Sequence, residues 1–350
     1  MRTDTPPPPR TATRLPPVLG LLLLAPVCAE YLAGYDDSTG NVTELLGGLV
    51  VFVPLYGCAA LIVRETARRA GRGWPTMLLL ATAFGVLQPG MIDQAMFNPS
   101  YRDIDYLGPM LEATYIPALG LGGYLSLGWV AGHVIFSVCA PIAIVETFVP
   151  DRRATPWLGL PGLAVAVVAF GLAAAFVVKW HLDTEGFVPT AAQLTGAGAV
   201  VVALIVTAFA TGRRPAPPIG RPAPGPWVVG AVAFVLLLVP DLFGLVVEWA
   251  GLDPAMAIDW RGFAVLAGRL AVLLALLWAW SRRTGWRAHH RLAVAGGALL
   301  STSVTAFVTE PIGDVTAAAK LWHNMFFLIV VVLLVASAGV RASRAGRVTV

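Results

Sequence analysis

Charged side chains are scarce in this chain of 350 residues. Asp, Glu, Lys and Arg together make up 13% of it, whereas they make up about a quarter of a soluble domain. Hydrophobic residues make up 57%, and the mean hydropathy is +0.75. This composition excludes a soluble globular domain and indicates an integral membrane protein.

Cysteine is scarce too, and the familiar catalytic motifs are missing. Cys28, Cys58 and Cys139 all lie inside apolar runs, without the spacing of metal ligands, so we expect buried free thiols and neither a disulfide framework nor a zinc site. The chain has no Gly-x-Ser-x-Gly elbow, no phosphate-binding Gly-rich loop with Lys, no His-Glu-x-x-His and no Cys-x-x-Cys. We therefore expect no metal and no cofactor.

The chain contains ten apolar runs of roughly membrane-spanning length. About 20 residues of helix cross the hydrocarbon layer. The runs cover 15–34, 45–64, 74–96, 121–149, 157–180, 190–211, 227–250, 260–281, 292–311 and 321–340. The predicted fold class is all-α, a polytopic transmembrane helix bundle of about ten spans with both termini cytoplasmic. We expect the first run to stay as a helix; a cleaved signal peptide ending near Cys28 is the alternative.

Basic residues alternate between the loops in a way that fixes the predicted orientation. Only four of the 24 Lys and Arg residues fall in loops assigned to the outside, namely Arg102, Lys179, Arg261 and Lys320. Nearly all the others fall in segments assigned to the cytoplasm, which agrees with the positive-inside rule. The net charge of +4 is thus explained by topology, and we expect no nucleic-acid partner. The expected location is the cell (cytoplasmic) membrane.

Loop composition predicts the remaining organisation. Residues 1–14 are Pro-rich and basic and should form a disordered cytoplasmic tail. A first group of six spans (15–211) precedes a Pro-rich cytoplasmic connector (212–226), and a second group of four spans (227–340) precedes a cytoplasmic tail (341–350). The longest outer loop, Phe97 to Gly120, is rich in aromatic residues, so we expect a structured cap there.

Polar residues inside the third and fourth runs are the best functional lead. A polar group in the bilayer core is costly unless it has a partner. In straight helices Gln88 and His133 both lie about 21 to 24 Å from the inner end, so they can meet. The Pro89-Gly90 step loosens the third helix beside them, and Asp93 faces the same region one turn further out. The alternative is that His133 only packs or forms a hydrogen bond.

Two further pairs complete the candidate polar cavity. Asp241 and Arg269 lie at equal depth on either side of one turn, where a salt bridge is the simplest expectation and a polar pocket or proton path the alternative. Glu310 and His323 flank the last outer turn, where they can form an ordinary hydrogen bond or a proton relay. Near the span ends, we expect Glu30 to be solvated, and we expect Glu146 to anchor the topology by reaching water or pairing with Arg152 or Arg153.

Several short motifs between residues 55 and 160 resemble an uncharacterised family of bacterial polytopic membrane proteins. They are Tyr56-Gly57, Arg64-Glu65, Gly71-Arg72-Gly73-Trp74-Pro75, Ala83-Phe84-Gly85, Phe97-Asn98-Pro99, His133 to Ser137, Pro141-Ile142 and Val145-Glu146. The region is also similar to the CAAX-protease and bacteriocin-processing (CPBP) intramembrane peptidases. Trp129 and His133 match the aromatic-x-x-x-His motif of those peptidases, and His323-Asn324 loosely resembles a later histidine motif.

The chain departs from the peptidase pattern where the chemistry would occur. Gln88-Pro89 stands in place of a Glu-Glu pair, and Asp93 stands in place of an arginine. Gln88 and Pro89 cannot act as the general base that activates water. The resemblance therefore implies a shared architecture without proteolysis.

Three functions remain as hypotheses, and the expected partners are the lipid bilayer and a small-molecule or lipid-like ligand. The leading one is a non-catalytic CPBP-like bundle with an outward polar cavity for that ligand. The second is a proton-coupled secondary transporter of the five-plus-five kind. The third is a membrane-embedded enzyme acting on a prenyl or lipid substrate, which needs carboxylates that converge on an apolar pocket.

Overall fold

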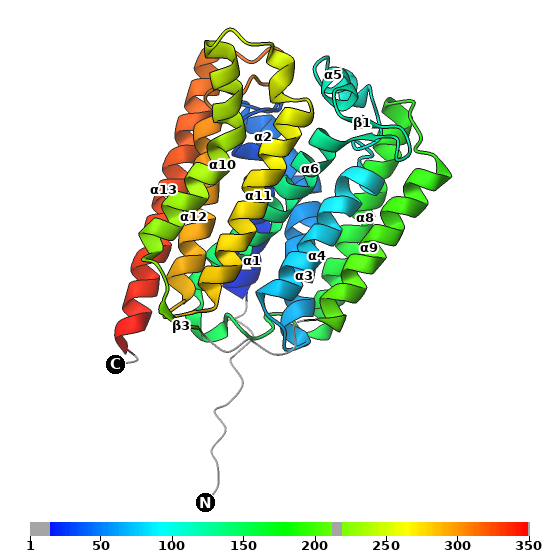
Figure 1. Cartoon of the computed structure of the whole chain (residues 1–350). Coiled ribbons are helices and arrows are strands. Elements are labelled where there is room, and N and C mark those ends of the chain that lie inside the picture. The colour runs from blue at the N-terminus through cyan, green and yellow to red at the C-terminus, as the bar shows by residue number, and fades with distance from the viewer. Residues whose placement is uncertain (1–14, 212–218, 349–350) are drawn as a thin grey trace, which may run out of the picture.

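The structure is a computed structural model that describes residues 15–211 and 219–348. The predicted N-terminal tail and the first part of the predicted connector lie outside these residues. Within them the chain forms an all-α bundle (Figure 1), as the apolar runs predict. Eight of the helices described are long and apolar enough to cross a membrane, and the shorter helices Leu15–Tyr31 and α12 occupy the other two predicted spans.

The helical elements follow the predicted runs closely. In chain order the helical spans are α1 (Leu15–Pro26) with η2 (Val27–Tyr31), α2 (Val42–Phe52) with η3 (Val53–Gly57) and α3 (Cys58–Arg69), α4 (Trp74–Leu87) with η4 (Gln88–Ile92), α6 (Gly123–Gly132) with η6 (His133–Cys139) and α7 (Ala140–Phe148), α8 (Leu160–Thr184), α9 (Ala191–Ala210), α10 (Pro226–Trp249), η8 (Pro254–Ala257) with α11 (Trp260–Ser281), α12 (Ala288–Thr305) and α13 (Ala317–Val348). Residues 341–348, predicted as a tail, extend the last helix.

Polar residues at the loop boundaries start several of these helices. Asn41 accepts hydrogen bonds from the first turn of α2, Asp259 does so for α11, and Thr190 and Gln193 form a capping box at α9. These caps satisfy backbone N–H groups that have no partner within a helix. The residues between the caps are mostly apolar, as a segment that crosses the hydrocarbon layer requires.

The bundle has two flanks around a central span. In Figure 1, α10 to α13 lie on one flank and α3, α4, α8 and α9 on the other. The span α6–η6–α7 contacts both flanks, because it packs against α4 on one side and against α12 on the other. The first and last described helices begin and end at the same end of the bundle, as an even number of spans requires. We call this the inner end; its cytoplasmic location stays a prediction.

The opposite, outer end carries an ordered cap. The cap contains the short helices η5 (Tyr101–Asp103) and α5 (Leu107–Glu112) and the antiparallel strands β1 (Tyr115–Ile116) and β2 (Leu121–Gly122). Ile104, Leu107 and Leu111 are buried against Leu125 of α6. The expectation of a structured outer loop is therefore confirmed.

At the inner end, one contact joins two distant loops. Strand β3 (Ile219–Pro222) pairs in parallel with β4 (Arg283–Thr284). The described part of the predicted connector is thus attached to the loop that follows α11.

Four wide, π-helical turns interrupt the central spans. They are η2, η3, η4 and η6. Such turns are rare and often occur at functional sites, and Pro54 and Pro89 lie within two of them. Each wide turn inserts a residue relative to an α-helix, so it changes which side chains face the interior.

A glycine contact between α1 and η3 provides a test of this packing. A Cβ at Gly57 would lie 2.6 Å from the carbonyl oxygen of Leu22, whereas a Cβ at Gly47 would meet no atom within 4 Å. We expect Gly57→Ala to destabilise the protein by about 1–3 kcal/mol through overpacking. Gly47→Ala, the control in the same span, should be neutral or stabilising. Thermal unfolding of both purified variants measures the difference; equal melting temperatures would contradict the close packing.

Candidate functional site

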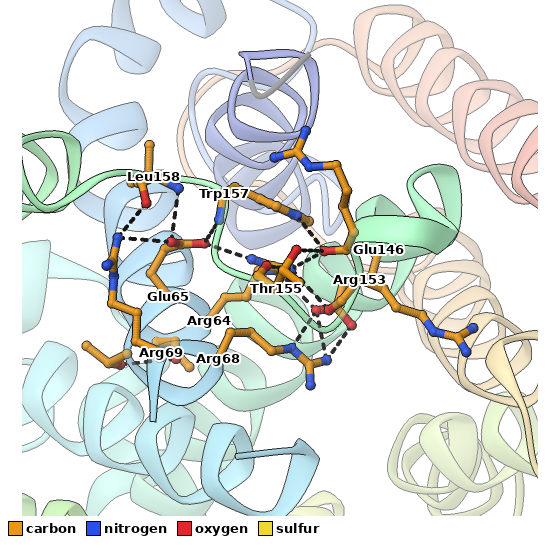
Figure 2. Close-up of polar contacts among 12 residues, drawn as sticks. Arg64, Glu65, Arg68, Arg69, Glu146, Arg153, Thr155, Trp157 and Leu158 are labelled. Carbon is orange, nitrogen blue, oxygen red and sulfur yellow. Dashed lines mark hydrogen bonds and ion pairs between the residues drawn. The ribbon is translucent and has the colours of Figure 1, made fainter. Parts of the chain in front are cut away.

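The inner end contains a buried ionic network centred on Arg64 (Figure 2). The Arg64 guanidinium donates to Glu65 at 2.7 Å and to Glu146 at 3.0 Å. It also donates to the carbonyl oxygens of Arg152, Arg153 and Thr155. The Arg64 side chain is fully buried. Water cannot reach it, so these protein groups supply its hydrogen-bond partners.

The same network fixes the loop between α7 and α8. The Arg64 guanidinium lies 3.3 Å from the centroid of the Trp157 ring. The Glu65 carboxylate accepts from the backbone N–H groups of Trp157 at 2.8 Å and Leu158 at 3.0 Å. The Glu65 carboxylate and the Arg64 guanidinium each form several hydrogen bonds. A buried pair with so many partners has a structural role.

Glu146 belongs to this network, which corrects its expected pairing. Its carboxylate receives hydrogen bonds from Arg64 and from Arg68, the latter at 2.8 Å to each oxygen. The sequence suggested Arg152 or Arg153 as partners because they follow closely in the chain. The structure instead joins α7 to α3, so Glu146 connects two spans. It does not anchor one span to water.

A second polar cluster lies in the π-helical turns. We call it the outer cluster and define it as Glu30, Tyr56, Gln88, Asp93 and His133. Glu30 lies in η2, Tyr56 in η3, Gln88 in η4 and His133 in η6, while Asp93 directly follows η4. Four different spans therefore each contribute a polar or aromatic side chain from a wide turn.

Tyr56 is the centre of the outer cluster. The Gln88 side-chain amide donates weakly to the Tyr56 hydroxyl at 3.5 Å and to the Asp93 carboxylate at 3.4 Å. The His133 ring stacks on the Tyr56 ring with centroids 5.9 Å apart, and the Tyr56 hydroxyl lies beside the Glu30 carboxylate. Gln88 and His133, predicted to meet, are thus brought together through a shared tyrosine.

Hydrogen bonds within the outer cluster leave acceptors unused. Gln88 is 2% exposed, yet its carbonyl oxygen has no hydrogen-bond donor in the part of the chain that the structure describes. Glu30 accepts from the Tyr35 hydroxyl at 2.7 Å. Among the described residues no Lys or Arg lies within 4.0 Å of the carboxylate of Glu30 or Asp93. Both carboxylates of the inner network have arginine partners, whereas these two have none within that distance among the described residues.

The outer acids act on two tyrosines beyond the spans. Burial, and next the negative charge of Glu30, raise the pKa of Tyr35 well above its ordinary value. Burial, and next the charge of Asp93, do the same to the pKa of Tyr101 in the cap. Both phenols stay neutral, because burial and the nearby acids disfavour the phenolate.

The cap is held over this end of the bundle by Arg102. Its guanidinium lies 3.0 Å from Asp36, and its backbone N–H donates to Glu185 of the α8 end at 2.7 Å. Arg102 and Asp103 have φ values of 55° and 51°, in the left-handed region that costs a residue with a Cβ about 1 kcal/mol or more. The ionic contacts offset this backbone strain, so the cap keeps a defined conformation.

Asp241 and Arg269 do not join the outer cluster, and the expected salt bridge is not formed. The Arg269 guanidinium donates to the carbonyl oxygen of Leu237 at 2.7 Å, and within the described chain no nitrogen of Arg269 lies within 4.0 Å of Asp241. The two side chains are near enough to influence each other, and both influence Tyr124 of α6. Equal depth in neighbouring helices does not ensure that side chains face one another.

Glu310 and His323 are also apart. The His323 ring accepts from the N–H of Gly40 at 3.1 Å and contacts the carbonyl oxygen of Tyr31 at 2.8 Å. These two backbone partners assign a neutral imidazole with its proton on Nε2. Glu310 is exposed and lies outside these contacts. His323 therefore joins the last helix to the loop after η2 and is not available as a proton relay.

Sequence reasoning missed two members of the outer cluster. Glu30 lies near a span end, where solvation is the usual outcome, but in the structure it is half-buried and bonded to Tyr35. Tyr56 lies in an apolar run, where an aromatic residue usually only packs. The available signal was Pro54, two residues before Tyr56, and Pro89, directly after Gln88, since prolines in spans mark irregular helix turns.

The fold and both polar centres define a polytopic helical membrane protein. Within this class, the model of a family described as "Uncharacterized membrane protein family" matches residues 19–348, so the chain belongs to that family. No curated protein and no solved structure matches the chain.

The Arg64 network gives a stability prediction. Arg64→Lys keeps the charge but loses the planar fork that reaches several acceptors at once. Because buried acceptors then remain without donors, we expect a loss of about 3 kcal/mol or more and a lower melting temperature. The control is Arg261→Lys, since Arg261 pairs with Asp259 at the exposed surface and should tolerate lysine. An unchanged melting temperature for Arg64→Lys would contradict the network's structural role.

Proposed function

We propose that this protein is a non-catalytic membrane bundle whose outer cluster binds a small ligand that enters from the outer end. One observation carries the proposal: four wide helix turns bring polar side chains from four spans to one place, and a buried acceptor there, the Gln88 carbonyl oxygen, has no donor among the described residues. In the Arg64 network, by contrast, every carboxylate oxygen of Glu65 and Glu146 accepts a hydrogen bond. Unpaired buried polar groups are costly in a membrane and are typical of binding sites.

The groups in the outer cluster favour binding over catalysis. Gln88 has no titratable group, and the His133 Nδ1 is engaged with the Ser137 hydroxyl at 3.1 Å. The resemblance to CPBP peptidases is consistent with this arrangement, because the chain keeps the histidine and lacks the glutamates. Gln88 and Pro89, at the positions of the peptidase glutamates, cannot activate water, which supports a binding role.

Open space beside the cluster supports access for a ligand. Glu30, Asp93 and His133 are only half-buried although they lie among the central spans. A Cβ at Gly128 or Gly132 of α6 would meet no atom within 4 Å, and Gly132 directly precedes His133. We infer that a ligand reaches the cluster along this face of α6.

An enzyme acting on prenyl or lipid substrates is less well supported. Such an enzyme needs carboxylates that converge on an apolar pocket. An apolar groove of about 530 Å³ does lie between α1, α7 and α13, lined by residues such as Leu24, Ile144 and Phe148, but no acidic residue lines it. The carboxylates of the outer cluster instead lie beside Tyr56 and Gln88.

Cysteine labelling tests access to the site. In a chain with Cys28, Cys58 and Cys139 changed to Ala, Gly132→Cys should react with a small neutral methanethiosulfonate at least about tenfold faster than Ser303→Cys, because close-packed interiors admit reagents only on local opening. Ser303 is the control, being 1% exposed on α12. Equally slow labelling of both variants in detergent would contradict an accessible site.

A proton-coupled transporter is the second candidate. The carboxylates of Glu30 and Asp93, which lack a basic partner within 4.0 Å among the described residues, favour it, since such groups carry protons across membranes in pumps and transporters.

The same Gly132→Cys variant separates the two candidates. A transporter must expose its site to each side in turn, so an impermeant reagent would label Gly132→Cys in sealed vesicles of either orientation. A binding protein that opens only outward would be labelled in right-side-out vesicles alone. We expect the second result, and labelling from both sides would favour transport.

A further inference from the structure

The buried polar atom of the outer cluster that lacks a hydrogen-bond partner in the described chain is an acceptor. The Gln88 carbonyl oxygen is buried and without a donor within the described residues. The Glu30 carboxylate has the hydroxyls of Tyr35 and Tyr56 beside it. Within the described part of the chain, Asp93 accepts only the N–H of Ala95 and the weak Gln88 contact. A carboxylate can accept about four hydrogen bonds. A ligand that satisfies this site must therefore donate several.

The charge of the outer cluster also favours a ligand that donates hydrogen bonds, namely a cation. Two carboxylates share the site, and the nearest basic side chain that influences Glu30, Arg102, is already engaged by Asp36 and Asp37. A bound anion would add to this negative charge. A bound cation would neutralise this charge inside the protein, where an unpaired charge is costly.

Three aromatic rings lie in and beside the outer cluster. Tyr56, Phe84 and His133 contact one another, with ring centroids 5.7 to 6.2 Å apart. The faces of aromatic rings attract cations. No group of three or more His, Cys, Asp or Glu suited to a metal ion occurs among the residues described, which favours an organic cation over a metal.

From these observations we infer that the outer cluster binds a small primary ammonium ion, with its N–H groups donated to Glu30, Asp93 and the Gln88 carbonyl oxygen. The inference rests on the proposed binding function and specifies the ligand class. A quaternary ammonium ion carries the same charge but has no N–H to donate, so it should bind less well.

Thermal unfolding tests the inference. The melting temperature of the purified full chain in detergent is measured in methylammonium, tetramethylammonium and sodium chloride at equal ionic strength. A ligand that binds only the folded state raises the melting temperature. We expect methylammonium to raise it by about 2–5 °C over sodium, and tetramethylammonium to raise it less.

Variants assign the effect to the cluster. Asp93→Asn and Glu30→Gln should each abolish the methylammonium effect, whether or not they change the melting temperature in sodium. Glu112→Gln, which removes an exposed carboxylate from the cap, is the control and should keep it. If Asp93→Asn does not fold, Glu30→Gln and Gln88→Leu provide the same readout.

The outcomes separate this inference from the proposed function. Rapid labelling of Gly132→Cys together with equal melting temperatures in methylammonium and sodium would overturn the ammonium assignment and leave a binding site for another ligand. Slow labelling would reject the accessible site itself. A shift by tetramethylammonium as large as that by methylammonium would overturn the assigned hydrogen bonds, and retention of the methylammonium shift in both carboxylate variants would place the cation elsewhere.

Discussion

The rest of the structure depends on the burial of one guanidinium. Arg64 reaches two carboxylates and three carbonyl oxygens and packs on an indole ring, so α3, α7 and the loop before α8 are held in one arrangement. No hydrophobic driving force holds helices together inside lipid, and a saturated ionic centre supplies both adhesion and register. With the inner end fixed in this way, the outer end can contain irregular turns without losing the fold.

The four π-helical turns make the outer part of the bundle irregular, in contrast to the inner network around Arg64. A π-helical turn spoils regular packing and frees backbone groups, which a membrane tolerates only where the protein interior satisfies them. The N–H of Met96 meets this demand by bonding the carbonyl oxygen of Pro89 at 2.9 Å. Tyr56 and His133, which lie within two of these turns, stack on each other. The irregular backbone is therefore the device that assembles the outer cluster.

The fold could be predicted from the sequence more fully than the site. Long apolar runs separated by basic and acidic loops predict spans because lipid penalises any other pattern, and the observed helices follow those runs. The direction in which a side chain faces could not be predicted in this way. Depth calculated for straight helices placed Asp241 opposite Arg269, but facing depends on helix rotation, and Arg269 bonds a backbone carbonyl instead. Gln88, Asp93 and His133 were found because polar residues in a span are conspicuous, whereas Glu30 and Tyr56 joined them only through the wide turns.

The bond between His323 and Tyr31 has a consequence for how the chain is assembled. Its partners are 292 residues apart, and the same helices share apolar contacts through Tyr31 and Phe327. The contacts between the span that contains Tyr31 and the helix that contains His323 therefore cannot form until that last helix has been made. Contacts of such long sequence separation form late, so the membrane itself must shelter the early spans until the bundle closes.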